Sequence, residues 1–361
     1  MFENIRLISI SMVGAGLACW VIIITGGLHG KYTFDHNIDA VQKYHKRPVP
    51  RIGGLAFLAG LICAGVYHGL EADQELYLAK WAGVAAIPVF LGGVLEDLHK
   101  GMAARERLLL AFFSATIAHY ELNVGLVRID WVWFDATIIT MPGVTLLLTV
   151  IMVGGVAHAS NIIDGFNGLL LGVTLLTLGA FSWVGYQVGD ATLVTYLAIM
   201  VGAALGVFIF NFPLGRIFLG DGGAYLIGFF LAVIALILVR NHAAISPWFP
   251  LTVLAYPVTE TVFSIFRKKF VSRTPAMAPD QYHFHMLVHD KFVSNWRGRW
   301  VSNGNAITAL IMWGIHLLGL VPGILWWNKT PYLLASLFVF VLFYVSLYLW
   351  LARRIQSTIN S

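Results

Sequence analysis

Long apolar stretches alternate with short polar segments along the whole of this chain. An α-helix needs about 20 apolar residues to cross the hydrocarbon core of a bilayer, and most of the stretches approach or exceed that length. They lie at 7–28, 53–70, 81–95, 107–122, 142–158, 168–188, 192–210, 223–239, 247–266, 304–324 and 332–352. The pattern predicts an all-α polytopic membrane protein with about 11 transmembrane helices. With no repeat or low-complexity linker, we expect a single domain over residues 1–361.

Composition agrees with a membrane protein. Of the 361 residues, 58% are hydrophobic and 11% are charged, whereas a soluble domain has about 25% charged residues. Cys19 and Cys63 both lie inside apolar stretches, so the sequence indicates neither a disulfide framework nor a cysteine–zinc site.

The basic residues predict the orientation. Of the 23 Lys and Arg residues, 18 fall in 31–52, 96–107, 211–222, 267–303 and after the last stretch. Loops rich in Lys and Arg stay in the cytoplasm, so we expect the N-terminus outside and the C-terminus in the cytoplasm. The net charge of +5 then reflects topology, and we expect no nucleic-acid partner.

Four polar segments should emerge together on the cytoplasmic face. They are Glu96-Asp97 in GGVLEDLHK, Asp164 in NIIDGFNGL, Asp221 in FLGDGGAYLIG, and His283 and His285 with Asp280. Acids, amides and histidines gathered on one face predict a reaction site there. A secondary transporter, the first alternative, would instead place its polar residues near mid-membrane in broken helices.

The residue types of these segments suit phosphate chemistry. Asp221 stands among glycines, where backbone amides can approach a phosphate while the carboxylate holds a hard cation. The glycines around Asp164 permit similar turns, and Asn167 can pair with the edge of a base. For Glu96, Asp97 and Asn211, a solvated or capped helix end is the simpler interpretation. His283, His285 and His289 have a spacing open to zinc, but beside Lys268, Lys269 and Arg273 we interpret them as an anion-binding cluster.

In their order and spacing the four segments resemble the motifs of the polyprenyl-phosphate N-acetylhexosamine-1-phosphate transferases. The resemblance runs from His45-Lys46-Arg47-Pro48 to the loop from Arg273 to His285. It implies transfer of a sugar-1-phosphate from a UDP-sugar to undecaprenyl phosphate, with release of UMP and with Mg²⁺, or Mn²⁺ in its place, as cofactor. It also implies a bacterial inner-membrane enzyme, a cytoplasmic active site and a homodimer.

The resemblance also implies a role for individual residues. Asp221 and Asn161 would be the metal ligands. Asp97, with Glu96 beside it, would assist the attack of the lipid phosphate, and Arg273, His283 and His285 would hold the pyrophosphate. Asp164 would be the acid of the second motif. The substrate-binding residues would be Asn167, Gly165, Phe218, Asn211, Lys46 and Arg47, with uracil against the first three. We expect direct in-line attack, with a covalent aspartyl intermediate as the alternative.

Two residues depart from the family pattern. Glu96 stands where an aspartate is usual, and His158 stands where an asparagine is frequent, either as a neutral hydrogen-bonding group or as a titrating one. A catalytically silent scaffold is therefore a further alternative. The HFH form, preceded by Arg273 and Pro279-Asp280, is similar to the branches that use UDP-GlcNAc or related N-acetylhexosamines for O-antigen, teichoic acid or exopolysaccharide. It is less similar to the phospho-MurNAc-pentapeptide branch, so we expect UDP-GlcNAc, with other UDP-N-acetylhexosamines as alternatives.

Overall fold

A computed structural model describes residues 2–34, 48–71, 77–99, 101–141, 143–272, 282–293 and 304–359 of the chain. Within these ranges the chain is helical and forms no β-strand, apart from an isolated bridge between Phe34 and Pro50. The expected all-α architecture is confirmed.

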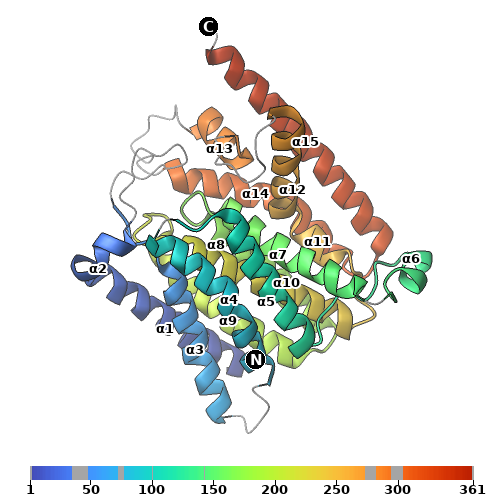
Figure 1. Ribbon diagram of the computed structural model, residues 1–361, viewed down its shortest axis with the longest axis horizontal. Coiled ribbons are helices and arrows are strands. Elements are labelled where there is room, and N and C mark those ends of the chain that lie inside the picture. Colours follow the sequence, from blue (N-terminus) through green and yellow to red (C-terminus); the bar gives the residue numbers. More distant parts are fainter. Residues whose placement is uncertain are drawn as a thin grey trace.

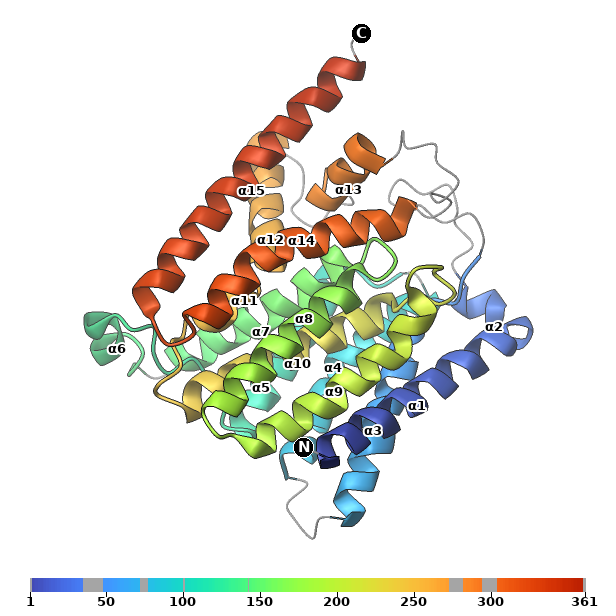
Figure 2. The same cartoon turned by 180° about the vertical axis from the view of Figure 1, so that it is seen from behind.

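The N-terminal half forms a bundle of long helices (Figure 1). α1 packs on α3 and α9, and α5 packs on α4 and α7. Short α2 and α6 lie outside this bundle in both views (Figures 1 and 2). The helices of this half are α1 (Phe2–Ile24), α2 (Gly26–Thr33), α3 (Gly53–Glu71), α4 (Tyr77–His99), α5 (Ala104–Glu121), α6 (Val132–Thr137), α7 (Val144–Ile163), α8 (Leu169–Gln187) and α9 (Ala191–Asn211).

α10 (Gly220–Asn241) is the central helix of the molecule (Figures 1 and 2). It contacts α3, α4, α5, α7 and α8, and almost all of its residues are buried. A helix that is apolar on every side is typical of such a central position. Its ends and its neighbours therefore determine where the polar motifs meet.

Glycines bring α3 and α4 into backbone contact with α10. A Cβ added to Gly54 would lie 2.4 Å from the nitrogen of Gly223, and one added to Gly93 would lie 2.4 Å from the nitrogen of Gly222. Side chains on either partner would force the helices apart, so small residues at such crossings permit tight packing in membranes. The close approach occurs at the N-terminal end of α10, where Asp221 lies.

The C-terminal part stands beyond this bundle, where α12 and α13 lie beside the middle of α15 (Figures 1 and 2). The stretch predicted as one helix at 247–266 is divided at Leu254. Pro257 explains the break, because proline has no N–H to bond the carbonyl four residues earlier and its ring crowds that carbonyl. The elements are α11 (Phe249–Val253), α12 (Ala255–Phe266), a π-helical segment η1 (Arg267–Ser272), α13 (Phe284–Val288), a second such segment η2 (His289–Val293), α14 (Gly304–Leu325) and α15 (Thr330–Ile359).

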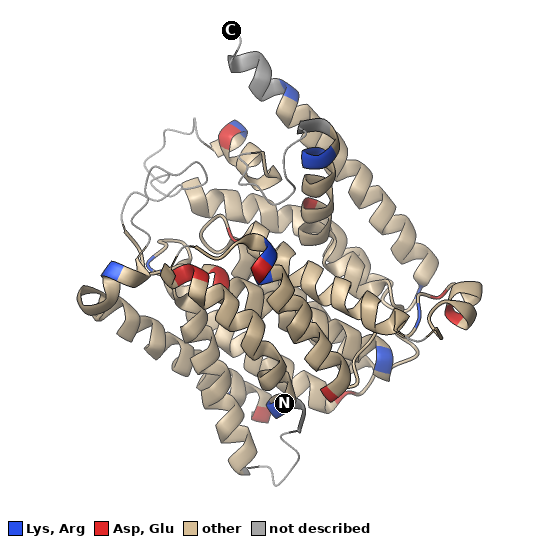
Figure 3. Ribbon diagram, viewed as in Figure 1, with Lys and Arg blue, Asp and Glu red and all other residues tan. Residues whose placement is uncertain are grey.

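Of the helices in the described ranges, nine are long and apolar enough to cross a membrane: α1, α3, α4, α7, α8, α9, α10, α14 and α15. Charged residues are sparse along these helices and gather near their ends (Figure 3). The protein is thus a multi-pass membrane protein. The two other predicted spans correspond to α5, which carries charges in its first turns, and to the divided α11–α12; the count of eleven and the orientation stay predictions.

We expect Gly93→Ala to destabilise the protein, because its methyl group would collide with the backbone of α10. Overpacking of this kind costs about 1–3 kcal/mol. Gly83→Ala is the matched control on the same helix, because a Cβ there meets nothing within 4 Å. Thermal unfolding in detergent should show a lower midpoint for the first variant and no loss for the second. Equal midpoints would contradict the close contact of α4 with α10.

Candidate active site

The carboxylate of Asp97 is bound to the first turn of α10. Asp97 lies in the last turns of α4 and is only 2% exposed. Its Oδ1 accepts a hydrogen bond from the N–H of Asp221 and its Oδ2 from the N–H of Gly222, both at 2.9 Å. Amides in the first turn of a helix have no partner within the helix, and its dipole favours negative charge there. Asp97 thus caps α10 from a different helix, and the first and third acidic motifs form one site.

Two arginines neutralise these acids. Arg51, which precedes α3, bonds the Oδ1 of Asp221, and its Nε lies 3.3 Å from Asp97 Oδ1. Arg107, near the start of α5, forms an ion pair with the other oxygen of Asp221 and lies over the ring of Tyr225. Removing charges from water is costly unless they are paired, so the pairs stabilise the acids. Both guanidinium groups remain partly exposed, which leaves them accessible to an anion.

The second acidic motif lies next to the same cluster. Asp164 directly follows α7, and burial raises the pKa of its carboxyl to about 7, while the charge of Arg51 opposes that rise. Its electrostatic interaction with Arg51 places Asp164 near the acids of the other two motifs. The predicted convergence of the three acidic motifs is therefore present in the structure.

Asparagines hold the loops that follow the second motif and α9. The Oδ1 of Asn211 accepts from the N–H of Gly168 at 2.6 Å, and its Nδ2 donates to the carbonyl of Ile217 at 2.7 Å. The Nδ2 of Asn167 donates to the carbonyl of Pro213 at 3.2 Å. These side chains fix the loop between α9 and α10 against the start of α8. Their expected contacts with a nucleoside stay predictions.

Phe218 lies on a backbone segment that pairs with the start of α3. Its N–H donates to the carbonyl of Pro50 at 2.8 Å, and its carbonyl accepts from the N–H of Gly53 at 2.9 Å. The ring is half-buried. The segment carrying Arg51 is thus anchored beside the residue that we expect to stack on uracil.

The histidine motif faces the second acidic motif. The rings of His283 and His285 are stacked, with centroids 5.6 Å apart and planes inclined by 3°. A Cβ added to Gly165 would lie 3.0 Å from the Nε2 of His285, so that nitrogen points toward the loop after Asp164. Nε2 of His285 is buried and has no hydrogen-bond partner among the described residues. A buried polar atom without a partner is rare in proteins and marks a place where a ligand could bind.

Of the remaining predicted residues, Glu96 and His158 make hydrogen bonds near the acids, and four others are not described. Glu96 is half-buried and accepts a hydrogen bond from the N–H of Met102 at 2.8 Å. His158 bonds the hydroxyl of Tyr225 at 2.8 Å, as its hydrogen-bonding alternative predicts. Lys46, Arg47 and Arg273, together with Asp280, lie outside the described residues.

The oxygen donors around α10 fit a hard divalent cation. His158 on α7 bonds Tyr225 on α10, and Asn161 follows His158 by about one turn toward the end of α7. Mg²⁺ is commonly held by one or two carboxylates and by waters. Within the described ranges no group of three His, Cys, Asp or Glu side chains has the arrangement of a metal site, and this includes the three histidines considered for zinc.

Sequence reasoning missed three charged residues of this region. Arg51 and Arg107 are recognisable only from their contacts with Asp221, and Glu260, which bonds the histidine motif, lies in a predicted apolar span. The consecutive polar residues Thr259, Glu260 and Thr261, with Ser264 one turn later, were the one available signal.

Comparison with known proteins gives the same family as the motifs. The sequence model of glycosyl transferase family 4 matches residues 81–239, which include nearly all of α10 and all three acidic motifs. The chain is 26% identical over 283 residues to an undecaprenyl-phosphate alpha-N-acetylglucosaminyl 1-phosphate transferase of Thermotoga maritima, covering 77% of this chain and 79% of that relative. It is 29% identical over 267 residues to a phospho-N-acetylmuramoyl-pentapeptide-transferase of Clostridium botulinum, covering 70% and 80%.

A third relative is a "Probable undecaprenyl-phosphate N-acetylglucosaminyl 1-phosphate transferase" of Bacillus subtilis, 25% identical over 249 residues. That match covers 68% of this chain and 66%, just under two thirds, of the relative. All three relatives are named as transferases, as the motifs lead us to expect. With the family model on the acidic motifs and these relatives along most of its length, the chain is similar to the members of glycosyl transferase family 4.

Proposed function

We propose that the protein transfers an N-acetylhexosamine-1-phosphate from its UDP-sugar to undecaprenyl phosphate and releases UMP. The observation that carries the proposal is the cluster in which Asp97, Asp221, Arg51 and Arg107 meet at the start of α10. Similar transfers to undecaprenyl phosphate are named for the relatives in Thermotoga and Bacillus. UDP-GlcNAc is the substrate that we infer, in the synthesis of a cell-surface polysaccharide.

The reaction brings several negative charges together. An oxygen of the lipid phosphate bonds to the sugar-bearing phosphorus, and the bridging oxygen leaves with UMP. Such transfers depend on positioning and charge stabilisation more than on covalent chemistry by the protein. Arg51 and Arg107 are suited to this task, because a guanidinium group can bind phosphate oxygens in a bidentate manner. The lipid phosphate, with a second pKa near 6, is largely a dianion at neutral pH and can attack directly.

In this scheme Asp97 orients the first turn of α10 and does not abstract a proton, because both of its oxygens already accept hydrogen bonds from that turn. Asp221 would hold a divalent cation with Asn161, as the resemblance implies, and the ion would neutralise charge on the pyrophosphate. Asp221 already balances two guanidinium groups, which would then be released toward the phosphates.

His285 would take part as a neutral group. Burial lowers the pKa of its ring to about 4, although the nearby Glu260 carboxylate opposes this effect. The ring thus carries no charge at neutral pH, and its unpartnered Nε2 can bond a substrate oxygen or a water without adding a positive charge. The positive charge at the site would come from the arginines.

The lipid substrate fits the predicted placement in the membrane. The polyprenyl chain stays in the bilayer while its phosphate reaches the ends of the helices. We place the reaction at the cytoplasmic face of a bacterial inner membrane, where UDP-sugars are available, and infer a homodimer from the resemblance alone.

We expect purified protein to release UMP from UDP-GlcNAc only with undecaprenyl phosphate and Mg²⁺. Asp221→Asn should lower kcat by at least about 100-fold, because removing one strong electrostatic contact at a reaction centre costs about 10² to 10³ in rate. The measurement is UMP formation over a panel of UDP-N-acetylhexosamines. If none of them gives UMP with wild-type protein, the transferase proposal is wrong and the silent scaffold is favoured.

We expect His285 to make stability depend on pH. Its folded-state pKa of about 4 lies below the ordinary 6.5, so the stability that the neutral ring supports is complete above pH 6.5 and is lost as pH falls toward 4. The loss is at most about 1.4 kcal/mol per pH unit. Wild-type protein and His285→Gln are compared by thermal unfolding in detergent, since both retain Asp164, whose raised pKa acts in the opposite sense. The difference between their midpoints should shrink from pH 7 to pH 4, and a constant difference would show that the ring is not the titrating group.

A further inference from the structure

Glu260 is a buried carboxylate that none of the recognised motifs includes. It lies in the middle of α12 and is 0% exposed. An ionised carboxylate removed from water costs several kcal/mol unless donors surround it. Its partners therefore indicate what the residue is for.

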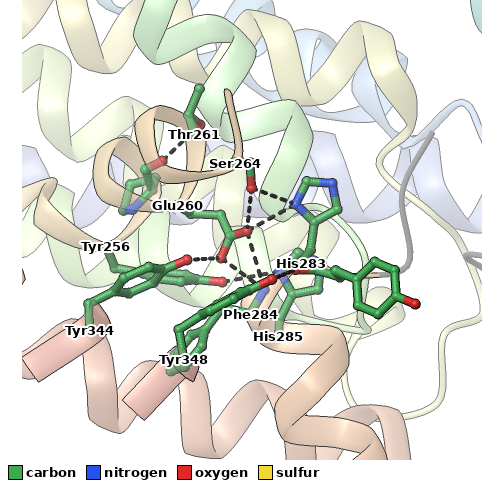
Figure 4. A network of polar contacts seen from close by, with 11 residues as sticks. Tyr256, Glu260, Thr261, Ser264, His283, Phe284, His285, Tyr344 and Tyr348 are labelled. Atoms are coloured by element: carbon green, nitrogen blue, oxygen red, sulfur yellow. Dashed lines mark hydrogen bonds and ion pairs between the residues drawn. The ribbon is translucent and has the colours of Figure 1, made fainter. Parts of the chain in front are cut away.

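Four groups donate hydrogen bonds to Glu260 (Figure 4). Oε1 accepts from Nδ1 of His283 at 2.9 Å and from the hydroxyl of Ser264 at 3.2 Å. Oε2 accepts from the hydroxyl of Tyr344 at 2.9 Å and from the N–H of Phe284 at 3.2 Å. All of these partners can donate, so the carboxylate is satisfied in its ionised form. Two of the four donors belong to the histidine motif.

The face of α12 that carries Glu260 contacts the histidine motif at more than one position. Tyr256, Glu260 and Ser264 are spaced four residues apart and so lie along one side of the helix. The hydroxyl of Tyr256 lies 3.4 Å from Nδ1 of His285, one turn below the contact of Glu260 with His283. The stacked histidines are thus held on the same helix face at two levels.

The contact with Glu260 determines the tautomer of His283. A carboxylate accepts only, so Nδ1 of His283 carries the hydrogen and Nε2 carries the lone pair in the neutral ring. In Figure 4 the nitrogen that does not contact Glu260 points away from the carboxylate. Carboxylates that bond the far nitrogen of a functional histidine fix its orientation and its tautomer.

We propose that Glu260 is a positioning residue of the transferase site, which holds His283 with its hydrogen on Nδ1 and thereby presents Nε2 to the substrate. This role rests on the proposed function. Glu260 itself touches no substrate and acts through His283. By also bonding the N–H of Phe284, it fixes the backbone between the two stacked rings.

Tyr344→Phe is the matched control for a merely structural role. Tyr344 lies on α15, is fully buried and donates to the same carboxylate, but it does not contact His283. Its substitution disturbs the same pocket and leaves the bond between Glu260 and His283 in place. A general loss of packing would affect both variants alike.

The first test is a double-mutant cycle on UMP release. We expect Glu260→Met to lower kcat about 10- to 100-fold with little change in KM, as is typical when a carboxylate behind a histidine is removed. Tyr344→Phe should change kcat by less than about threefold, since one neutral hydrogen bond contributes about 0.5–1.5 kcal/mol and acts here only on the carboxylate. If Glu260 acts through His283, Glu260→Met should cost little in the background of His283→Gln. Additive losses, or equal losses for Glu260→Met and Tyr344→Phe, would overturn the proposal. If the Met variant does not fold, Glu260→Gln takes its place in the same cycle.

The second test does not need activity. Nitrogen-15 NMR of protein with labelled histidine reports which ring nitrogen carries hydrogen, and the signal lost in His283→Gln identifies His283. We expect protonated Nδ1 in wild-type protein and in Tyr344→Phe; unprotonated Nδ1 in wild-type protein would overturn the assignment. If wild-type protein gave no UMP, the proposed function would fail while this measurement still tested the contact of Glu260 with His283.

Discussion

The bond between the carboxylate of Asp97 and the first turn of α10 is the constraint on which the rest of the site depends. Two backbone amides that α10 cannot satisfy by itself are bonded by a side chain from α4. The same turn carries Asp221, so the two acids keep a fixed spacing. Arg51 pairs with both acids and Arg107 pairs with Asp221, and their positive charges offset the repulsion between the acids.

This arrangement requires that the helices meet without intervening side chains. Gly54 and Gly93 allow the backbones of α3 and α4 to reach the backbone of α10 at its N-terminal end. The polar contacts at the start of α10 thus depend on the close packing that the glycines permit. Two groups of helices hold the site: α4, α7 and α10 carry the acids, whereas α12 and α15 hold the histidine motif.

Much of this could be predicted from the sequence. The apolar stretches predicted the helices, and the acids at their ends predicted the meeting of Asp97, Asp164 and Asp221, because helix ends on one side of a bilayer share a face. The break at Leu254 was missed, since apolar periodicity continues through it and Pro257 acts only on the backbone. Arg51 and Arg107 were missed because their roles depend on contacts with residues distant in sequence. Glu260 was missed because a single acid within an apolar run gives no turn, glycine or spacing signal.

The glycine contacts have a consequence for motion. Helices whose backbones touch have no compressible side chains between them, so α4 and α10 must move as one rigid body, with Asp97 and Asp221 attached. The histidine motif is held by hydroxyl and carboxylate groups at the tips of side chains, which tolerate rotation and sliding. The acids are therefore held through backbone contacts, whereas the histidine motif is held through side chains, so we expect the histidine motif to be the more easily displaced of the two.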